Sequence, residues 1–271
     1  MVETIFVLRH GFRLNWVTTN WTSPTALPRD PPLAVFGETQ AKEAAEYFLS
    51  LPEDERPTAI YSSPYYRCLQ TSKPVSAALG VPIYVEHGLS EWYSPVEPGT
   101  GLHPRPSSAA DLQNHFSEID DSWSSIWYPS RKGEDVDGVH DRAGDFLEAF
   151  VPEVEQRFER KHKRVLLVSH AATVIAIARE SVGDRSLPIR VPTCSLTILK
   201  RKPEVGTIRG GWEALLLADG SHLKEGSQRD WGFDDIQIAN GKVINDHGVP
   251  GTEGEEDHPV GNQLLGQASR M

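Results

Sequence analysis

Arg9, His10 and Gly11 form the stretch of this sequence with the clearest chemical potential. They directly follow residues 5–8, a short apolar run without an amphipathic pattern, which is typical of a strand buried on both faces. Open α/β folds bind their ligands at the carboxyl ends of such strands. An arginine and an imidazole at that edge predict a phosphate site, and the glycine lets a ligand approach the backbone.

Further polar side chains follow other predicted strands. Arg67 lies in the first turn of a predicted helix, within SSPYYRCLQT, where its guanidinium and the helix N-terminus can both attract an anion. Glu91 lies in the loop after the third strand, and His170 directly follows the fourth. Two arginines and two histidines around one point predict a site for a dianionic phosphoryl group. Arg13 is a third candidate for this site, or it pairs with a surface aspartate.

Strand and helix patterns alternate along the chain. Apolar runs predict strands over 5–8, 58–61, 81–85, 165–168, 195–199 and 212–217, and helical spacing predicts helices over 36–51, 65–79, 137–163 and 173–182. This alternation predicts a mainly parallel sheet in a three-layer α/β/α sandwich, with the last two strands as antiparallel edge strands. We expect one domain over 1–220 with an insertion at 86–130. Residues 221–271 are polar and are expected to form a flexible extension.

The composition limits the classes of partner. A net charge of −11 over 271 residues argues against direct nucleic-acid binding or an acidic membrane surface, so an anion must bind in a local basic pocket. Two cysteines without metal-ligand spacing indicate a reducing compartment. Neither an eighteen-residue apolar run nor a secretion signal is present. We therefore expect a soluble protein of the cytoplasm or nucleus.

Four motifs in order resemble the histidine phosphatase superfamily, in its phosphoglycerate-mutase-like branch. They are RHG at 9–11, SSPYYRCLQT at 62–71, GLSEWY with its acidic Glu91, and SHAA at 169–172, and the likeness spans about 2–217. The resemblance implies the fold of that branch. It also implies a phosphatase that uses neither a metal nor another cofactor.

The resemblance assigns a role to each site residue. His10 would attack phosphorus and form a phosphohistidine. Arg9, Arg67 and His170 would hold the phosphoryl oxygens, with Arg13 as a further contact. Glu91, if kept protonated, would protonate the leaving oxygen and later activate water.

The sequence departs from the family pattern at substrate-facing positions. Phe12 replaces the usual Glu or Gln after RHG, and two alanines replace the glycines after the second histidine. Arg13 stands where mutases have a serine, and with Asn15 it is closer to the branch that includes ecdysteroid and tyrosine phosphatases. Hydrolysis is thus favoured over mutase action on a phosphosugar or phosphoglycerate, the second alternative. Asn15, Phe12 and Trp92 are expected to contact a phosphorylated small molecule or phosphoprotein.

An aromatic rim is one interpretation of four side chains near these motifs, namely Trp16, Trp21, Trp92 and Tyr93. Such a rim would select phosphotyrosine or another aryl phosphate, although exposed aromatic residues of a Pro-rich loop explain the pattern equally well. RHGFRLNW and EHGLSEWYSP are also similar to the tau subunit family of the fungal RNA polymerase III general transcription factor. That likeness implies the alternative of a protein-complex subunit with a vestigial or phosphate-sensing pocket.

Several other residues receive structural predictions. Ser63 is expected to cap its helix through the hydroxyl, and Cys68 to be buried and not reactive. His87, His103 and His115 are expected at the surface. The pair Trp123 and Trp127, four residues apart, is expected to form a packing face on a helix.

Overall fold

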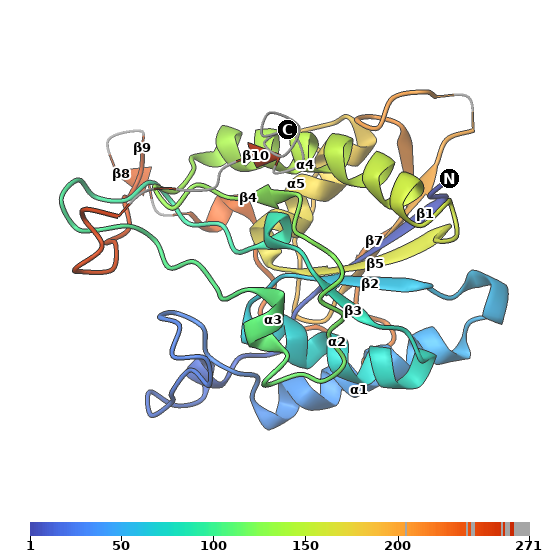
Figure 1. Cartoon of the computed structure of the whole chain (residues 1–271), viewed down its shortest axis with the longest axis horizontal. Coiled ribbons are helices and arrows are strands. Elements are labelled where there is room, and N and C mark those ends of the chain that lie inside the picture. Colours follow the sequence, from blue (N-terminus) through green and yellow to red (C-terminus); the bar gives the residue numbers. More distant parts are fainter. Residues whose placement is uncertain (204, 237, 240–241, 256, 258–260, 263–271) are drawn as a thin grey trace.

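A six-stranded mixed sheet is the centre of the computed structural model (Figure 1). The structure describes residues 1–271 except 204, 237, 240–241, 256, 258–260 and 263–271. The strands, in the spatial order β3-β2-β5-β1-β6-β7, are β3 (Ile83–Val85), β2 (Ala59–Ser62), β5 (Arg164–Ser169), β1 (Thr4–Arg9), β6 (Leu196–Arg201) and β7 (Trp212–Asp219). The first four run parallel, and β6 is antiparallel to both β1 and β7. The predicted mainly parallel sheet is confirmed, although only β7 of the two antiparallel strands is an edge strand.

Helices cover both faces of this sheet. In Figure 1, α1 (Val35–Ser50) and α2 (Tyr66–Leu79) lie below it, and α4 (Val136–Arg157) and α5 (Ala171–Val182) lie above it. Alternate residues of β1 enter the two cores: Ile5 and Val7 pack with α4 and α5, whereas Phe6 and Leu8 pack with α1 and α2. This is why residues 5–8 of β1 are all apolar, and it confirms the three-layer α/β/α sandwich.

Local signals in the sequence explain most helix ends. Gly80 stops α2 with a φ of 66°, a left-handed conformation that glycine adopts without steric cost. Asp135 begins α4 by accepting a hydrogen bond from the Gly138 amide at 2.7 Å. The predicted end of α4 at 163 is wrong, because Glu159 and Arg160 take left-handed φ angles and turn the chain toward β5.

The insertion and the last part of the chain form smaller elements. The 3-10 helices are η1 (Leu14–Trp16), η2 (Glu53–Glu55), η3 (His87–Leu89) and η4 (Phe233–Asp235); the remaining elements are α3 (Ala109–Leu112), β4 (Trp127–Tyr128), β8 (Ile238–Ala239), β9 (Lys242–Val243) and β10 (Gly261–Asn262). Trp123 is buried against Tyr61 and Phe150, as expected of a packing residue. The predicted helix around it is wrong, because Trp123 lies in a loop and Trp127 in β4.

The predicted extension over 221–271 falls partly outside the described residues. Its described part contacts the domain: Leu223 is buried, and the Trp231 and Val191 backbones exchange two hydrogen bonds. The division of the chain near residue 220 stays a prediction. None of the helices in the described part of the chain is long and apolar enough to cross a membrane.

A close backbone contact sets the position of the loop after β1. A Cβ built on Gly37, in the first turn of α1, would lie 2.2 Å from the Phe12 carbonyl oxygen, and one built on Gly11 would lie 2.6 Å from the Gly37 oxygen. Only glycine fits at either point, so the loop that follows the candidate nucleophile is held directly against α1.

We predict that Gly37→Ala lowers the free energy of unfolding by about 1–3 kcal/mol, because the methyl group must displace backbone. Urea denaturation measures this change. The matched control is Gly206→Ala, whose added Cβ would meet no atom within 4 Å. Equal stability of the two variants would contradict the account of this contact.

Candidate active site

The ends of β1 and β5 bring two histidines together. Arg9 of β1 is in register with Ser169 of β5, so the residues that follow, His10 and His170, lie side by side at the carboxyl edge of the sheet. Their ring centroids are 5.3 Å apart. Both side chains are buried. The predicted meeting of two sequence-distant histidines is therefore present in the fold.

His10 has the protonation state of a nucleophile. Its Nδ1 lies 2.8 Å from the Gly11 carbonyl oxygen, which can only accept, so Nδ1 carries the ring hydrogen and Nε2 keeps its lone pair. Burial lowers the pKa of His10 well below 6.5, and the positive charges of Arg67 and Arg9 lower it further. The imidazole is therefore neutral at physiological pH, with Nε2 available to attack.

Arg67 is fully buried and is held by two carboxylates. Nη1 donates to Asp30 at 2.9 Å, and Nη2 donates to Glu91 at 3.0 Å. Burial alone would lower the pKa of Arg67, but the two carboxylates outweigh it and raise that pKa, so the guanidinium stays charged. The other oxygen of Asp30 accepts from the Tyr66 amide at 2.7 Å, at the start of α2. This aspartate, which sequence reasoning missed, ties the loop before α1 to the arginine.

Ser63 does not cap α2, and that prediction is wrong. Asp30 already accepts the first free amide of the helix, and the Ser63 hydroxyl instead lies 2.8 Å from Nε2 of His170. A hydroxyl can donate or accept, so it satisfies Nε2 in either tautomer and fixes the ring. Burial lowers the pKa of His170 to about 4, although Glu91 opposes this effect. His170 therefore faces the site as a neutral hydrogen-bonding group.

Glu91 lies among positive and hydrogen-bonding groups. Its Oε2 is 3.0 Å from Arg67 Nη2 and 3.3 Å from His170 Nδ1. Burial would raise the pKa of Glu91, but the hydrogen bond with His170 and the positive charges of Arg67 and Arg13 outweigh it and lower that pKa below its ordinary value. The expectation of a protonated Glu91 is therefore not met in the ligand-free protein, because the surrounding cations stabilise the carboxylate. A dianion bound beside this carboxylate would raise its pKa again.

Arg9 and Arg13 provide two further positive charges. Nη1 of Arg9 donates to the carbonyl oxygens of Val191 and Arg229, both at 2.6 Å, and its Nε is buried without a partner in the described part of the chain. The Arg13 guanidinium lies over the Trp16 ring at 4.2 Å. Burial lowers the pKa of each arginine to about 10, so both remain charged at neutral pH. No described carboxylate pairs with Arg13, so the surface ion pair considered from sequence is not formed.

These groups surround one cavity of about 210 Å³. Its described lining residues are Arg9, His10, Arg13, Glu91, Trp92, Ala171, Ala172 and Trp231. Trp92 lines this cavity, and its role as a substrate contact stays a prediction. Phe12 packs instead against Trp16 and Phe36, and neither Phe12 nor Asn15 is among these lining residues, so their role stays a prediction. No local pattern pointed to Trp231, which lies in the segment expected to be an extension.

The chemistry of the cavity suits an anion better than a metal ion. Ligand atoms of His10, Glu91 and His170 all lie within 4.8 Å of one another and could coordinate a cation. However, the guanidinium groups of Arg9, Arg13 and Arg67 surround the same point and would repel it. A tetrahedral dianion receives charge-assisted hydrogen bonds from the same groups.

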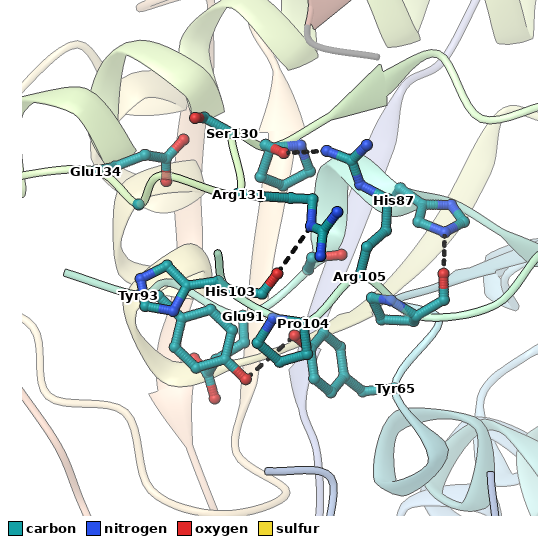
Figure 2. A pocket seen from close by; sticks show the side chains of 14 residues that line it. Tyr65, His87, Glu91, Tyr93, His103, Pro104, Arg105, Ser130, Arg131 and Glu134 are labelled. Carbon is teal, nitrogen blue, oxygen red and sulfur yellow. Dashed lines mark hydrogen bonds between the residues drawn. The ribbon is translucent and has the colours of Figure 1, made fainter. Parts of the chain in front are cut away.

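A second, smaller pocket shares Glu91 with this cavity (Figure 2). Its volume is about 30 Å³, roughly that of one water molecule. Arg105 of the insertion and Arg131, directly after it, line this pocket, but each donates to a carbonyl oxygen: Arg105 to Pro129 and Arg131 to His103, both at 2.9 Å (Figure 2). These bonds brace the insertion around Glu91.

Of the three histidines predicted at the surface, one is exposed and two are buried. His115 is exposed, as expected. His87 and His103 are buried in the wall of the second pocket, so the prediction is wrong for them. Their rings stack on Tyr128 and Tyr93, which the local sequence does not reveal. Cys68 is buried, as expected, and burial raises the pKa of its thiol.

Comparisons with known proteins agree with this geometry. Residues 5–211 match the model of the histidine phosphatase superfamily (branch 1). The chain is 32% identical over 267 residues to the transcription factor tau 55 kDa subunit of Saccharomyces cerevisiae, covering 88% of this chain and 60% of that protein. It is 23% identical over 238 residues to the ecdysteroid-phosphate phosphatase of Drosophila melanogaster, covering 73% of this chain and 30% of that protein. The chain thus spans 60% or less of these relatives.

A solved structure shows the same fold. The ecdysone phosphate phosphatase from Bombix mori, in complex with tungstate, superposes with a TM-score of 0.59 at 19% identity, covering 80% of this chain and 93% of that one. The sheet and its helices are therefore of the phosphoglycerate-mutase-like type. Three of the four motifs line the cavity, and Arg67 of the fourth contacts Glu91 beside it. Because the family model covers most of the chain, the chain belongs to the histidine phosphatase superfamily, branch 1.

Proposed function

We propose that this chain hydrolyses a phosphomonoester through a phosphohistidine formed on His10. The observation that carries the proposal is a buried, neutral imidazole with a free Nε2 at the edge of a cavity that Arg9 and Arg13 line and Arg67 adjoins. Phosphoryl transfer depends mainly on positioning and on charge stabilisation, and this cavity offers both. The substrate is a phosphorylated small molecule or a phosphorylated side chain of a protein.

The first step transfers the phosphoryl group to the enzyme. The Nε2 lone pair of His10 forms a bond to phosphorus while the bond from phosphorus to the ester oxygen breaks. Arg9, Arg67 and His170 hold the remaining phosphoryl oxygens and stabilise the charge of the transition state. The leaving oxygen takes a proton from Glu91, and His10 keeps its Nδ1 hydrogen bond to the Gly11 carbonyl.

The proton on Glu91 must arrive with the substrate. Glu91 is ionised in the free protein, whereas a phosphomonoester has a second pKa of about 6 and carries one proton below it. Binding of this monoanion beside the carboxylate yields a phosphoryl dianion and a protonated Glu91. The cations that lower the pKa of Glu91 also bind the dianion, so the exchange leaves no buried charge unpaired.

The second step releases phosphate. Glu91, now a carboxylate, takes a proton from a water molecule, whose oxygen attacks the phosphorus of the phosphohistidine. The bond from phosphorus to nitrogen breaks, and the electron pair returns to Nε2, so that His10 is again neutral. Transfer to a second hydroxyl compound instead of water would make the protein a mutase, which Arg13 in the position of the mutase serine disfavours.

A complex subunit is the second candidate function. The 32% identity to the tau 55 kDa subunit supports it, and that relative favours the nuclear alternative for location. In this role the pocket would hold a phosphorylated partner without turnover. A phosphatase releases inorganic phosphate, whereas a binding subunit leaves the phosphorylated partner intact, so a hydrolysis assay distinguishes the two functions.

We predict that the wild type hydrolyses phenyl phosphate with and without a chelator, and that His10→Ala loses at least about 10³-fold in kcat because no phosphohistidine can form. The matched control is His115→Ala, which removes an exposed histidine and should retain wild-type kcat. A folded wild type without turnover between pH 5 and 8 would refute the enzymatic proposal and favour the binding role.

We predict that kcat/KM for an alkyl phosphate is greatest below about pH 6 and falls tenfold per pH unit above it. The substrate monoanion supplies the proton, and this form disappears above its second pKa. His10 does not limit the rate in this range, because its pKa lies well below 6.5 and the ring is already neutral. A pH profile of kcat/KM tests this. A profile that rises from pH 6 to 8 would contradict the proposed origin of the proton.

A further inference from the structure

A segment after the sheet reaches the candidate active site. Residues 229–235 lie beyond the region that matches the family model, which ends at 211. The Trp231 and Val191 backbones exchange hydrogen bonds of 2.9 and 3.3 Å. Arg190 also pairs with Asp230 at 2.6 Å and with Asp235 at 2.7 Å. The segment is therefore attached by a backbone pair and by two ion pairs, and a substitution of the Trp231 side chain removes none of these bonds.

This segment positions one of the phosphate-binding groups. The carbonyl oxygen of Arg229 accepts from Nη1 of Arg9 at 2.6 Å, beside the matching bond from Arg9 to Val191. The Arg229 backbone has a φ of 51°, a conformation that costs free energy for any residue other than glycine. The two carbonyls occupy one end of the Arg9 guanidinium and leave the rest of it to meet an anion.

The same segment supplies one wall of the cavity. The Trp231 side chain lines it together with Trp92, and the two ring centroids are 6.2 Å apart. Phe233 packs behind both rings, 5.2 Å from Trp231 and 5.9 Å from Trp92. The indole nitrogen of Trp92 donates to the Glu134 carbonyl at 2.9 Å, which fixes that ring. These contacts make a supported aromatic wall.

The aromatic wall lies beside the place that the leaving group would occupy. Glu91, the proposed donor to the leaving oxygen, precedes Trp92 directly in the chain and lines the same cavity. His10, Arg9 and Arg13 line another part of the cavity and define the place of the phosphoryl group. A substituent on the ester oxygen that Glu91 protonates therefore extends along Trp92 and Trp231. Indole faces favour an aromatic ring over a polar chain.

We propose that Trp231 is a specificity-determining residue that selects a substrate whose leaving group is an aromatic ring, that is, an aryl phosphate monoester. The inference rests on the proposed phosphatase function and names the substrate class of the same site. Ring-to-ring contact within an aromatic wall strengthens binding by roughly threefold to tenfold beyond the burial of area.

The test compares binding of phenylphosphonate and methylphosphonate, neither of which can be hydrolysed at the carbon–phosphorus bond. We expect the wild type to bind phenylphosphonate at least about tenfold more tightly, and Trp231→Ala to reduce this ratio to about one. Trp231→Phe, which keeps a ring, should retain most of the preference. Leu215→Ala, at an exposed position of β7, is the surface control and should leave it unchanged.

Titration calorimetry gives both dissociation constants, and circular dichroism checks the fold of each variant. A wild type that binds the two phosphonates equally, or a folded Trp231→Ala that keeps the preference, would overturn the inference. If Trp231→Ala does not fold, the ratios of the wild type and Trp231→Phe decide, because loss of the preference in the phenylalanine variant would also overturn it. A ring preference without turnover of phenyl phosphate would support the subsite while refuting the hydrolytic function.

Discussion

The buried guanidinium of Arg67 is the interaction on which the site depends. It has no solvent to stabilise its charge, so Asp30 and Glu91 must do so, and removal of one partner from a buried ion pair costs about 3–5 kcal/mol. Asp30 comes from the loop before α1 and Glu91 from the loop after η3. The charge of Arg67 therefore holds the loop before α1 and the loop after η3 together.

The charges of the site suit the ligand that we propose, a phosphoryl group with two negative charges. Arg9 and Arg13 add positive charge that no neighbouring carboxylate cancels fully, while both histidines stay neutral because burial and these cations oppose their protonation. The same field keeps Glu91 ionised until an anion arrives. The buried arginines thus determine three properties of the site: its preference for an anionic ligand, the ionisation of Glu91 and the free lone pair of His10.

Local sequence signals predicted the sheet, and they predicted the site residues that come directly after a strand. Arg9, His10 and His170 each continue an apolar run, so their meeting at one edge follows from parallel pairing. The role of Ser63 depends on His170, from a distant segment, and on Asp30, which accepts the Tyr66 amide that Ser63 was expected to cap. The burial of His103 depends on its stacking on Tyr93, which no local pattern reveals. Trp231 was missed for the same reason, since the polar residues around it suggested an extension and its pairing with Val191 leaves no local pattern.

We propose that Nε2 of His10 receives the phosphoryl group. The most direct measurement mixes the protein with an aryl phosphate, stops the reaction within milliseconds in base, in which phosphohistidine survives, and maps the modified residue by mass spectrometry. We expect one added phosphoryl group on His10, formed no more slowly than phosphate is released. Turnover without this adduct, or with the phosphoryl group on another residue, would contradict the account.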